Sequence, residues 1–290
     1  MRIANASQAA FRSMDAEEFE LWKNLLEQRT GMALTQARKP FLEACIAQRL
    51  HALSLRQYQE YYHYLVEGGA AEKAMEWSIL VDQLTVQETS FFRHPSSFEL
   101  VKHELEAFYQ AHQPGYWNAW SVGCSTGEEP YSIAMLAHQV AKQYGREKQF
   151  GVMGTDISLS TITAAREGKY RVSRMHQVPA QWQAEYFESP AGGQLRINSI
   201  LRERVCFARL NVLELKKTPI NNMNLIYCQN MLIYFRRWRR HDIVRRLSEK
   251  LAVGGVLVLG LGELTEWRLP GLKRIEMADT LAFRRVAEVG

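Results

Sequence analysis

The sequence has few of the features that mark several common classes of protein. Its four cysteines lie far apart and form no C-x-x-C pair, which disfavours a zinc site and a disulfide framework. No apolar run approaches the roughly 20 residues that a helix needs to span a bilayer, and the N-terminal stretch MRIANASQAAFRSMD lacks the apolar core of a secretion signal. We therefore expect a soluble, cytoplasmic protein without a metal site and without membrane insertion.

Positive charge is only slightly in excess over negative charge. The chain carries 36 Lys and Arg against 31 Asp and Glu, a net charge of +5, with a pI of about 9.0. This balance suits an anionic partner, either nucleic acid or an acidic protein surface, without deciding between them. A hydrophobic content of 47% over 290 residues is enough for one large domain or two smaller ones.

The first third of the chain shows helical periodicity and almost no strand pattern. In AEEFELWKNLLEQRTGM, for example, Phe19, Trp22 and Leu26 fall on one helix face. Gly31 suits the residue that ends this helix. We predict a small all-helical domain, together with its linker, over residues 1–95.

From residue 116 the pattern changes to short apolar strands that alternate with helices. Such alternation predicts an α/β fold with a doubly wound, mostly parallel sheet, which we place in a domain over residues 96–290. One stretch, residues 169–204, interrupts the alternation, and Gly192-Gly193 within it predicts a turn in a small antiparallel insert. The predicted strands lie within 116–123, 149–158, 204–214, 223–235, 255–263 and 280–286.

A glycine-rich turn joins the first predicted strand to its helix, in WSVGCSTGEEPYSIAML (120–136). It does not have the G-x-G-x-x-G spacing with which dinucleotide-binding folds hold a pyrophosphate. Glu128 and Glu129 stand at the helix entrance, where two carboxylates repel phosphate and attract an ammonium or a sulfonium. The turn therefore favours a nucleoside ligand with a cationic tail over NAD or ATP.

Another acid, Asp156, ends the second predicted strand of the same strand–helix–strand unit. A carboxylate at that position commonly binds two ribose hydroxyls. Simpler interpretations stay open, because Glu128 and Glu129 also complement the helix dipole and Asp156 also suits a helix N-cap. Taken together, the three acids favour an adenosine ligand with a positive tail, and S-adenosylmethionine is the obvious candidate.

Four stretches of the sequence are similar to one known family. They are TVQETSFFRHPSSFE (85–99), WSVGCSTGEEPYSIAML, GTDIS (154–158) and CQNMLIYF (228–235). With the helical segment QRLHALSLRQYQEYYHYL before them, they resemble the CheR chemoreceptor glutamate methyltransferases over nearly the whole chain. The combination of STGEEPYSIA and ETSFFR is highly specific, whereas a lone glycine turn is not.

The resemblance implies methyl transfer from S-adenosylmethionine to glutamate side chains in the cytoplasmic helical region of methyl-accepting chemoreceptors, with S-adenosylhomocysteine as product. It also implies a doubly wound methyltransferase sheet with a small antiparallel β insert over residues 169–208, preceded by a small all-helical domain. By matching position, the resemblance also implies the cofactor contacts. Gln87, Thr89 and Arg93 would contact the methionine end, and Glu129 and Asp156 the amino group and the ribose. Around the adenine and the sulfur it implies Asn211, Val212, Asn230 and Met231.

The sequence departs from the family pattern at three positions. Gln87 stands where the family usually has Asn, Gln229 where it usually has Arg, and Cys124 where another small residue is commoner. We expect Gln87 to keep an amide on a longer arm, and Gln229 to remove a charge beside Asn230. These differences suggest a divergent branch of the family.

The expected reaction needs no proton abstraction, because a glutamate carboxylate is already ionised at neutral pH. The site then acts by aligning the reacting atoms and by excluding water. We expect Arg93 to orient the incoming carboxylate through a bidentate contact. We expect Tyr234 to hydrogen-bond near the methyl group, although a core tyrosine at a strand end fits the sequence equally well.

Two groups of basic residues are candidates for binding a partner. Arg49 and Arg56 are seven residues apart, so on one helix they share a face, and by position they resemble the family's receptor-contacting helix. The stretch RRWRRHDIVRRL (236–247) places six arginines in one predicted helix. A solvated helix surface is the simpler interpretation of that stretch, and binding of nucleic-acid phosphates is the alternative.

Two other functions stay open. An RNA methyltransferase is disfavoured, because Asn230 is followed by Met-Leu-Ile rather than by the Pro-Pro common in enzymes that methylate nucleic-acid bases. A non-enzymatic adaptor that binds the cofactor in a signalling array would keep Glu129 and Asp156 but would lack turnover.

Overall fold

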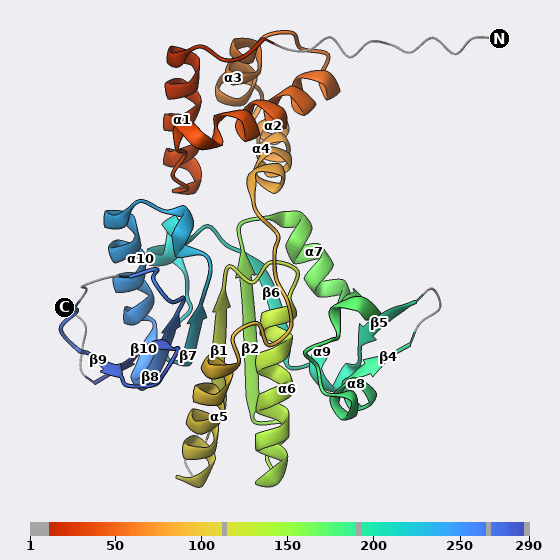
Figure 1. Cartoon of the computed structure of the whole chain (residues 1–290), viewed down its shortest axis with the longest axis vertical. Coiled ribbons are helices and arrows are strands. Elements are labelled where there is room, and N and C mark those ends of the chain that lie inside the picture. The colour runs from red at the N-terminus through yellow and green to blue at the C-terminus, as the bar shows by residue number, and fades with distance from the viewer. Residues whose placement is uncertain (1–11, 112–114, 190–192, 265–267, 287–290) are drawn as a thin grey trace. The chain divides into compact units, whose positions relative to one another are not determined.

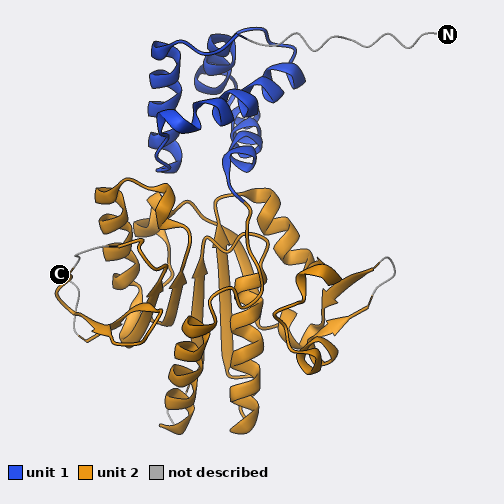
Figure 2. Cartoon of the chain, in the orientation of Figure 1, with its two compact units in different colours: residues 1–86 blue, residues 87–290 orange. Residues whose placement is uncertain are grey.

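The computed structural model describes residues 12–111, 115–189, 193–264 and 268–286. The chain divides into two compact units, residues 1–86 and residues 87–290 (Figure 2). The stretch 87–95, which the sequence analysis joined to the helical domain as a linker, therefore lies in the second unit. Phe91 is fully buried in the hydrophobic core of that unit, and this burial holds the stretch there.

The first unit is all-helical, as predicted, and packs around a core that includes Trp22 stacked on Tyr61. Its first helix begins with a capping box between Asp15 and Glu18 and ends at Gly31, whose φ of 78° favours glycine. The prediction that Gly31 ends this helix is confirmed. The helices are α1 (Ala16–Thr30), η1 (Gln36–Arg38), α2 (Lys39–Ala52), α3 (Tyr58–Glu67) and α4 (Ala70–Leu84).

Arg49 and Arg56 do not share a helix face, so that expectation was wrong. Helix α2 ends at Ala52, and the chain turns at Ser54, which has a φ of 57°. Arg49 forms a bidentate ion pair with the buried Glu76 of α4, at 2.7 Å and 2.9 Å, and is itself largely buried. Arg56 lies in the connection to α3, and its side chain is exposed.

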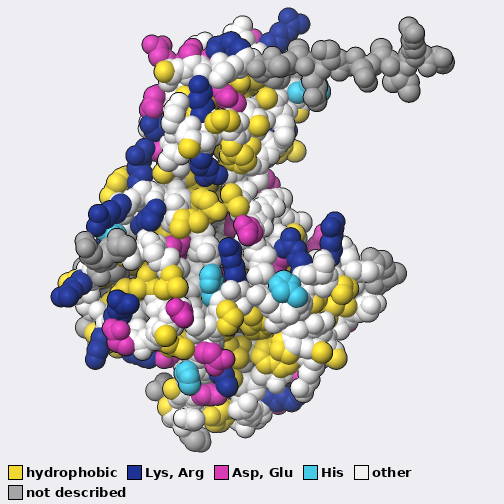
Figure 3. Space-filling view, viewed as in Figure 1, with side chains coloured by type: hydrophobic (Ala, Val, Ile, Leu, Met, Phe, Trp, Pro, Cys, Tyr) yellow, Lys and Arg dark blue, Asp and Glu magenta, His cyan; other side chains and the backbone are white. Residues whose placement is uncertain are grey.

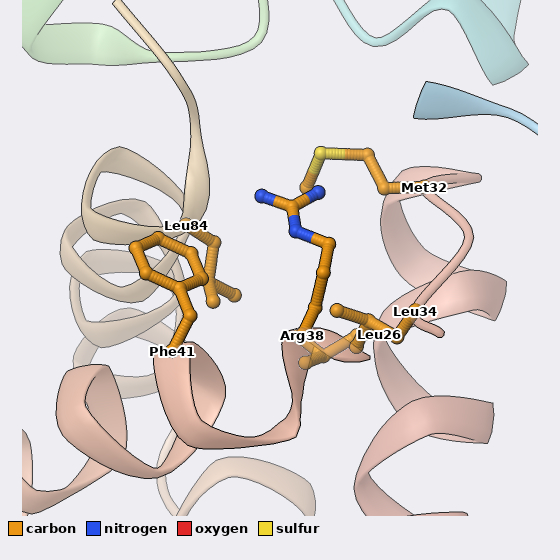
Figure 4. A pocket seen from close by; sticks show the side chains of 6 residues that line it. All are labelled: Leu26, Met32, Leu34, Arg38, Phe41 and Leu84. Carbon is orange, nitrogen blue, oxygen red and sulfur yellow. The ribbon is translucent and has the colours of Figure 1, made fainter. Parts of the chain in front are cut away.

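A small apolar hollow lies in the first unit (Figure 4). The guanidinium of Arg38 stands over the ring of Phe41, 5.3 Å from its centroid, within this hollow. All of its lining residues belong to the helical unit, so the hollow is separate from the glycine turn. They are Leu26, Met32, Leu34, Arg38, Phe41 and Leu84.

The second unit is built on a seven-stranded sheet with the order β6-β2-β1-β7-β8-β10-β9, which confirms the predicted α/β class (Figure 1). The pairs β6·β2, β2·β1, β1·β7 and β7·β8 are parallel, and β10 is antiparallel to both of its neighbours. Strand β9 was not predicted from the sequence. The strands are β1 (Trp117–Val122), β2 (Phe150–Asp156), β6 (Val205–Arg209), β7 (Met223–Cys228), β8 (Leu251–Leu259), β9 (Leu272–Ile275) and β10 (Leu281–Arg285).

Alternation along the strands creates two cores, one on each face of the sheet. On β1, for example, Trp117 and Ala119 join one core while Trp120 and Val122 join the other. Helices α5 (Pro95–Gln110), α6 (Glu128–Gln143) and α7 (Leu159–Glu167) supply the first core. The second contains α10 (Arg237–Glu249) and the short helix η3 (Val212–Lys217). Because both faces are covered, the parallel strands are almost wholly apolar.

The predicted antiparallel insert is present as a three-stranded sheet with the order β3-β5-β4. Residues 205–208, at the end of the expected insert, belong instead to β6, which pairs in parallel with β2 at the edge of the main sheet. The elements of the insert are β3 (Lys169–Arg171), η2 (Val172–Arg174), α8 (Ala180–Tyr186), β4 (Phe187–Glu188), β5 (Gln194–Ile197) and α9 (Ser199–Arg202).

Within the described ranges, no helix is both long enough and apolar enough to cross a membrane. The same ranges contain no cluster of three or more His, Cys, Asp or Glu side chains that could hold a metal ion. In an open α/β sheet of this kind, ligands bind at the carboxyl ends of the parallel strands.

Candidate active site

The glycine turn after β1 has a backbone conformation that residues other than glycine adopt infrequently. Gly123, Ser125 and Gly127 all have positive φ, at 76°, 48° and 95°. A Cβ on Gly127 would lie 2.9 Å from the Cβ of Ala165, so α6 begins against α7 with no room for a side chain. A Cβ on Gly123 would come within 3.0 Å of the Met231 side chain.

Asp156 fastens this turn to the end of β2. Its Oδ2 accepts a hydrogen bond from the Ser125 amide at 2.9 Å, and its Oδ1 accepts one from the Ser158 amide at 3.0 Å. The N-cap of α7 is Ser158, whose hydroxyl accepts from the Thr161 amide. The interpretation of Asp156 as a helix N-cap is therefore wrong, and its carboxylate lies instead between the two loops where a ribose is expected.

The two acids at the start of α6 have different environments. Glu128 is fully buried and accepts hydrogen bonds from Arg174 at 2.8 Å and from Thr126 at 2.6 Å. Arg174 belongs to the insert, so this ion pair ties the insert to the glycine turn. Arg174 could not be predicted from the sequence, because helical and strand patterns carry no signal for a pairing across 46 residues. Both carboxylate oxygens of Glu128 thus bind side chains of the protein itself.

Glu129 is the acid that remains for a ligand. Its Oε1 accepts a hydrogen bond from the Ser121 hydroxyl at 2.7 Å. The pKa of Glu129 is raised to about 8, chiefly by burial; the Ser121 hydrogen bond lowers it, the nearby Glu263 raises it, and the charge of Arg93 lowers it. A carboxyl group that burial keeps largely protonated gains charge when a cation approaches, and this couples cation binding to loss of the proton.

The hydroxyl of Ser125 is buried in the turn and has no hydrogen-bond partner in the part of the chain that the structure describes. An unsatisfied buried hydroxyl costs about 1–3 kcal/mol, so a ligand that bonds to it recovers this energy. Together with the absence of a side chain at Gly127 and the carboxylates of Glu129 and Asp156, it fits a polar, cationic nucleoside. Ser125 was not among the site residues predicted from the sequence.

The connection after β7 brings the predicted residues Asn230 and Met231 to the same edge of the sheet. Asn230 has a φ of 58°, and its Nδ2 lies 2.8 Å from Nε2 of His94. Met231 packs against Gly123, as the close approach there shows. Tyr234 ends the short helix η4 (Leu232–Tyr234) and is partly buried.

A buried glutamate supports this connection. The carboxylate of Glu263 accepts hydrogen bonds from the amides of Gly260 at 2.8 Å and Ile233 at 3.3 Å. Burial raises the pKa of Glu263. Glu263 follows β8, so it joins the ends of two strands. It was not among the site residues predicted from the sequence.

The segment 87–95 is held on α6 and on the insert. The amide of Phe92 donates to the Ser132 hydroxyl of α6 at 3.1 Å, and the carbonyl of Thr89 accepts from Arg174 at 3.4 Å. Arg93 donates to the Glu88 carbonyl at 3.1 Å and lies near enough to Glu129 to lower its pKa. Gln87, at the start of this unit, is exposed.

The loop after β6 lies beside Asp156, because the Leu210 amide donates to the Asp156 carbonyl at 2.9 Å. The next two residues are the predicted adenine contacts. Asn211 caps η3 by accepting from the Leu213 amide at 3.0 Å, and Val212 is buried in the second core. Asn211 and Val212 therefore stand next to the carboxylate expected to bind the ribose.

Gln229 is buried beneath the site. Its Nε2 donates to the Ser97 hydroxyl at 2.9 Å and to the Leu259 carbonyl at 3.1 Å. Its Oε1 finds no partner among the described residues. Gln229 thus links the end of β7 to α5 and β8 without introducing a charge below Asn230.

Replacing Arg174 with alanine is expected to lower the free energy of unfolding by about 3 kcal/mol. The change leaves the fully buried Glu128 carboxylate without its cation, and breaking a buried pair costs roughly 3–5 kcal/mol. The lower end of this energy range applies because the Arg174 side chain is itself half exposed. Urea denaturation measures the change. The exposed Arg171 of β3 provides a control, since Arg171→Ala should alter stability by less than about 0.5 kcal/mol. Equal effects of the two variants would contradict the structural role of the ion pair.

Comparison with known proteins covers both units. The family model described as the CheR methyltransferase all-alpha domain matches residues 17–85, and the one described as the CheR methyltransferase SAM binding domain matches residues 87–278. A chemotaxis protein methyltransferase of Salmonella typhimurium is 32% identical over 82% of this chain and 81% of its own length. The corresponding protein of Escherichia coli is 31% identical, over 84% and 83%. Chemotaxis protein methyltransferase 1 of Pseudomonas aeruginosa is also 31% identical, over 85% and 89%.

Proposed function

Because the chain belongs to the CheR methyltransferase family and is an S-adenosylmethionine-dependent chemotaxis protein methyltransferase, we propose that its substrates are glutamate side chains in the cytoplasmic helical region of chemoreceptors. The products are glutamate methyl esters and S-adenosylhomocysteine. The observation that carries the proposal is the placement of Glu129 and Asp156 on two sides of one glycine turn. No phosphate-binding pattern accompanies them, so the site suits a nucleoside with a positive tail.

The residues around the turn fit this cofactor. We assign the ribose to Asp156, the ammonium group to Glu129, and a polar contact in the turn to the buried hydroxyl of Ser125. When bound, S-adenosylmethionine supplies a methyl group activated by a positively charged sulfur. We place the remaining contacts on residues of the 87–95 segment and of the loops after β6 and β7, namely Gln87, Thr89, Arg93, Asn211, Val212, Asn230 and Met231.

The chain's own residues contribute to the reaction by positioning the reacting groups and by shielding them from water. The acceptor carboxylate is ionised without help at neutral pH, so none of the site residues has to act as a general base. We assign to Arg93 the orientation of this carboxylate, because Arg93 is a partly buried residue whose charge acts on Glu129. We assign to Tyr234, which follows Met231 closely, a hydrogen bond at the reacting edge of the site.

The helical unit contributes a basic contact in this proposal. Of the two arginines predicted to bind the receptor, Arg49 is already engaged by Glu76 and Arg56 is exposed. We therefore assign the receptor contact to Arg56 and a structural role to Arg49, whose ion pair joins α2 to α4.

Incubation of the protein with radiolabelled S-adenosylmethionine and membranes from the parent organism tests the proposed function. We expect label in the receptors that mild alkali releases as methanol, since methyl esters hydrolyse readily and methylated amines do not. Label that is stable to alkali would contradict glutamate as the acceptor. Binding of S-adenosylhomocysteine without any transfer would favour the adaptor.

The affinity for S-adenosylhomocysteine is expected to rise about tenfold per pH unit between pH 6 and pH 7.5 and to level off near pH 8. The free protein holds the Glu129 proton up to a pKa of about 8, and an ammonium group stabilises the ionised form, so binding releases this proton. The charged or titratable groups near Glu129 include Arg93, Glu263, Cys124, Tyr227 and Cys228.

Calorimetry across this pH range measures the effect. Glu129→Gln should bind more weakly at pH 8 and show a flat profile, because the amide does not titrate. Adenosine, which lacks the ammonium group, is the matched control ligand and should show little dependence on pH. A slope that persists in Glu129→Gln would assign the titration to another group.

A further inference from the structure

Three large apolar side chains are exposed around the start of α10. Ile233, Trp238 and Leu261 have exposed fractions of 50%, 58% and 62%. Arg240 ties the loops that carry Ile233 and Leu261 together, because it donates to the carbonyls of Ile233 at 3.3 Å and Glu263 at 3.2 Å. The exposed side chains are therefore presented from connected, hydrogen-bonded loops, and grouped apolar exposure of this kind marks interaction surfaces.

The arginines of α10 fall into two groups. In the C-terminal half, Arg245 pairs with Glu249 at 2.6 Å and Arg246 with Asp242 at 2.8 Å, as in an ordinary solvated helix face. In the N-terminal half, Arg237 and Arg239 form no ion pair with any residue that the structure describes. Figure 3 shows Lys and Arg side chains gathered on the α10 side of the second unit.

The arginines in the N-terminal half of α10 do not stabilise the helix. The first turn of α10 contains no acid, and positive charges near a helix N-terminus are unfavourable because they face the positive end of the helix dipole. Arg239 stacks over the exposed ring of Trp238, 4.1 Å from its centroid. The Trp238 ring and the guanidinium of Arg239, which has no ion-pair partner among the described residues, together suit an apolar side chain flanked by carboxylates.

This surface adjoins the proposed methyl-transfer site. Ile233 lies in η4, between the Asn230–Met231 pair at the glycine turn and Tyr234. The amide of Ile233 is held by Glu263. A substrate segment seated on Ile233 and Trp238 would thus pass directly beside the residues assigned to the reaction.

We propose that the surface formed by Ile233, Arg237, Trp238, Arg239 and Leu261 docks the acidic amphipathic helix that carries the methylated glutamate. The inference rests on the proposed function and adds a second receptor contact, which lies on the second unit, residues 87–290. Charge complementarity selects the partner: its carboxylates pair with Arg237 and Arg239, and its apolar stripe covers the three exposed apolar side chains. Trp and Arg together are the residue types that most often dominate such interfaces.

Steady-state methylation of receptor-containing membranes by the full chain tests the proposal. Trp238→Ala and Arg237→Glu are each expected to raise the KM for receptor at least about tenfold, with kcat at saturating receptor and the Kd for S-adenosylhomocysteine within about twofold of wild type. Matched controls are Arg274→Glu, the same charge reversal on the exposed part of β9, and Val253→Ala, which removes an exposed apolar side chain of β8. Neither control should change the KM.

The outcomes separate this inference from the proposed function. Formation of methyl esters with an unchanged KM in both variants overturns the docking surface and leaves the function standing. Absence of methyl esters with the wild-type chain overturns the function. If Trp238→Ala does not fold, the exposed Arg237→Glu decides the matter alone. Salt-sensitive binding of an RNA duplex that Arg237→Glu abolishes, with the receptor KM unchanged, would assign the surface to nucleic acid.

Discussion

Asp156→Ala is expected to weaken the binding of S-adenosylhomocysteine by at least about 100-fold. Two hydroxyls bonded to one ionised carboxylate contribute about 1.5–3 kcal/mol each, and the loss of both corresponds to two orders of magnitude or more in Kd. The same carboxylate also accepts from the amides of Ser125 and Ser158. Its removal therefore loosens the glycine turn as well as the ribose contact.

Asp156→Asn is the milder change. The amide keeps the shape of the side chain and one oxygen acceptor, so it retains one of the two backbone amide bonds of Asp156 and loses the other together with the charge. We expect a loss of about tenfold or more from this variant. Calorimetry with S-adenosylhomocysteine gives both affinities, and thermal unfolding shows whether the fold is kept. Glu167→Ala, at the exposed end of α7, is the control and should bind normally. Binding by Asp156→Ala within threefold of wild type would contradict the ribose assignment.

The sheet could be predicted from the sequence because its cause is local. Each parallel strand is an apolar run bounded by glycines or polar residues, and burial on both faces makes such runs easy to recognise. Once strands and helices alternate, the carboxyl ends of the strands must meet at one edge. This is why the sequence alone places the glycine turn beside Asp156, although about 30 residues separate them along the chain.

The contacts that the sequence did not predict are those made across the fold. Arg174 reaches Glu128 from the insert, and Glu263 reaches the Ile233 amide from another strand end, and neither has a periodic or spaced signal. The unsatisfied hydroxyl of Ser125 depends on the burial of the turn and is equally invisible in the sequence.

The expectation for Arg49 and Arg56 failed for the opposite reason, because a local rule was extended too far. Residues seven apart share a face only while the helix continues, and α2 ends between them. The buried Glu76, which takes up Arg49, lies on another helix, so no local pattern in the sequence signals this ion pair.

Arg93→Ala is expected to lower kcat for receptor methylation by about 10- to 100-fold. A bidentate, charge-assisted contact to the acceptor carboxylate contributes about 1.5–3 kcal/mol, and without it the carboxylate is no longer held in line with the methyl group. Arg93→Lys keeps the charge but not the planar pair of donors, so its turnover should lie between those of alanine and wild type. Arg274→Ala, on the exposed part of β9, should leave turnover unchanged.

A second measurement shows whether Arg93 acts through its charge at the site. Arg93 lowers the pKa of Glu129, so Arg93→Ala should move the pH at which S-adenosylhomocysteine affinity levels off upward from about 8. Arg93→Lys should leave that pH nearly unchanged, because a cation remains near Glu129. A fall in turnover together with this upward shift places Arg93 beside both the cofactor's amino group and the reacting carboxylate. Undiminished turnover in Arg93→Ala, with cofactor binding intact, would exclude Arg93 from catalysis and leave the alignment of the acceptor to the loop of Tyr234.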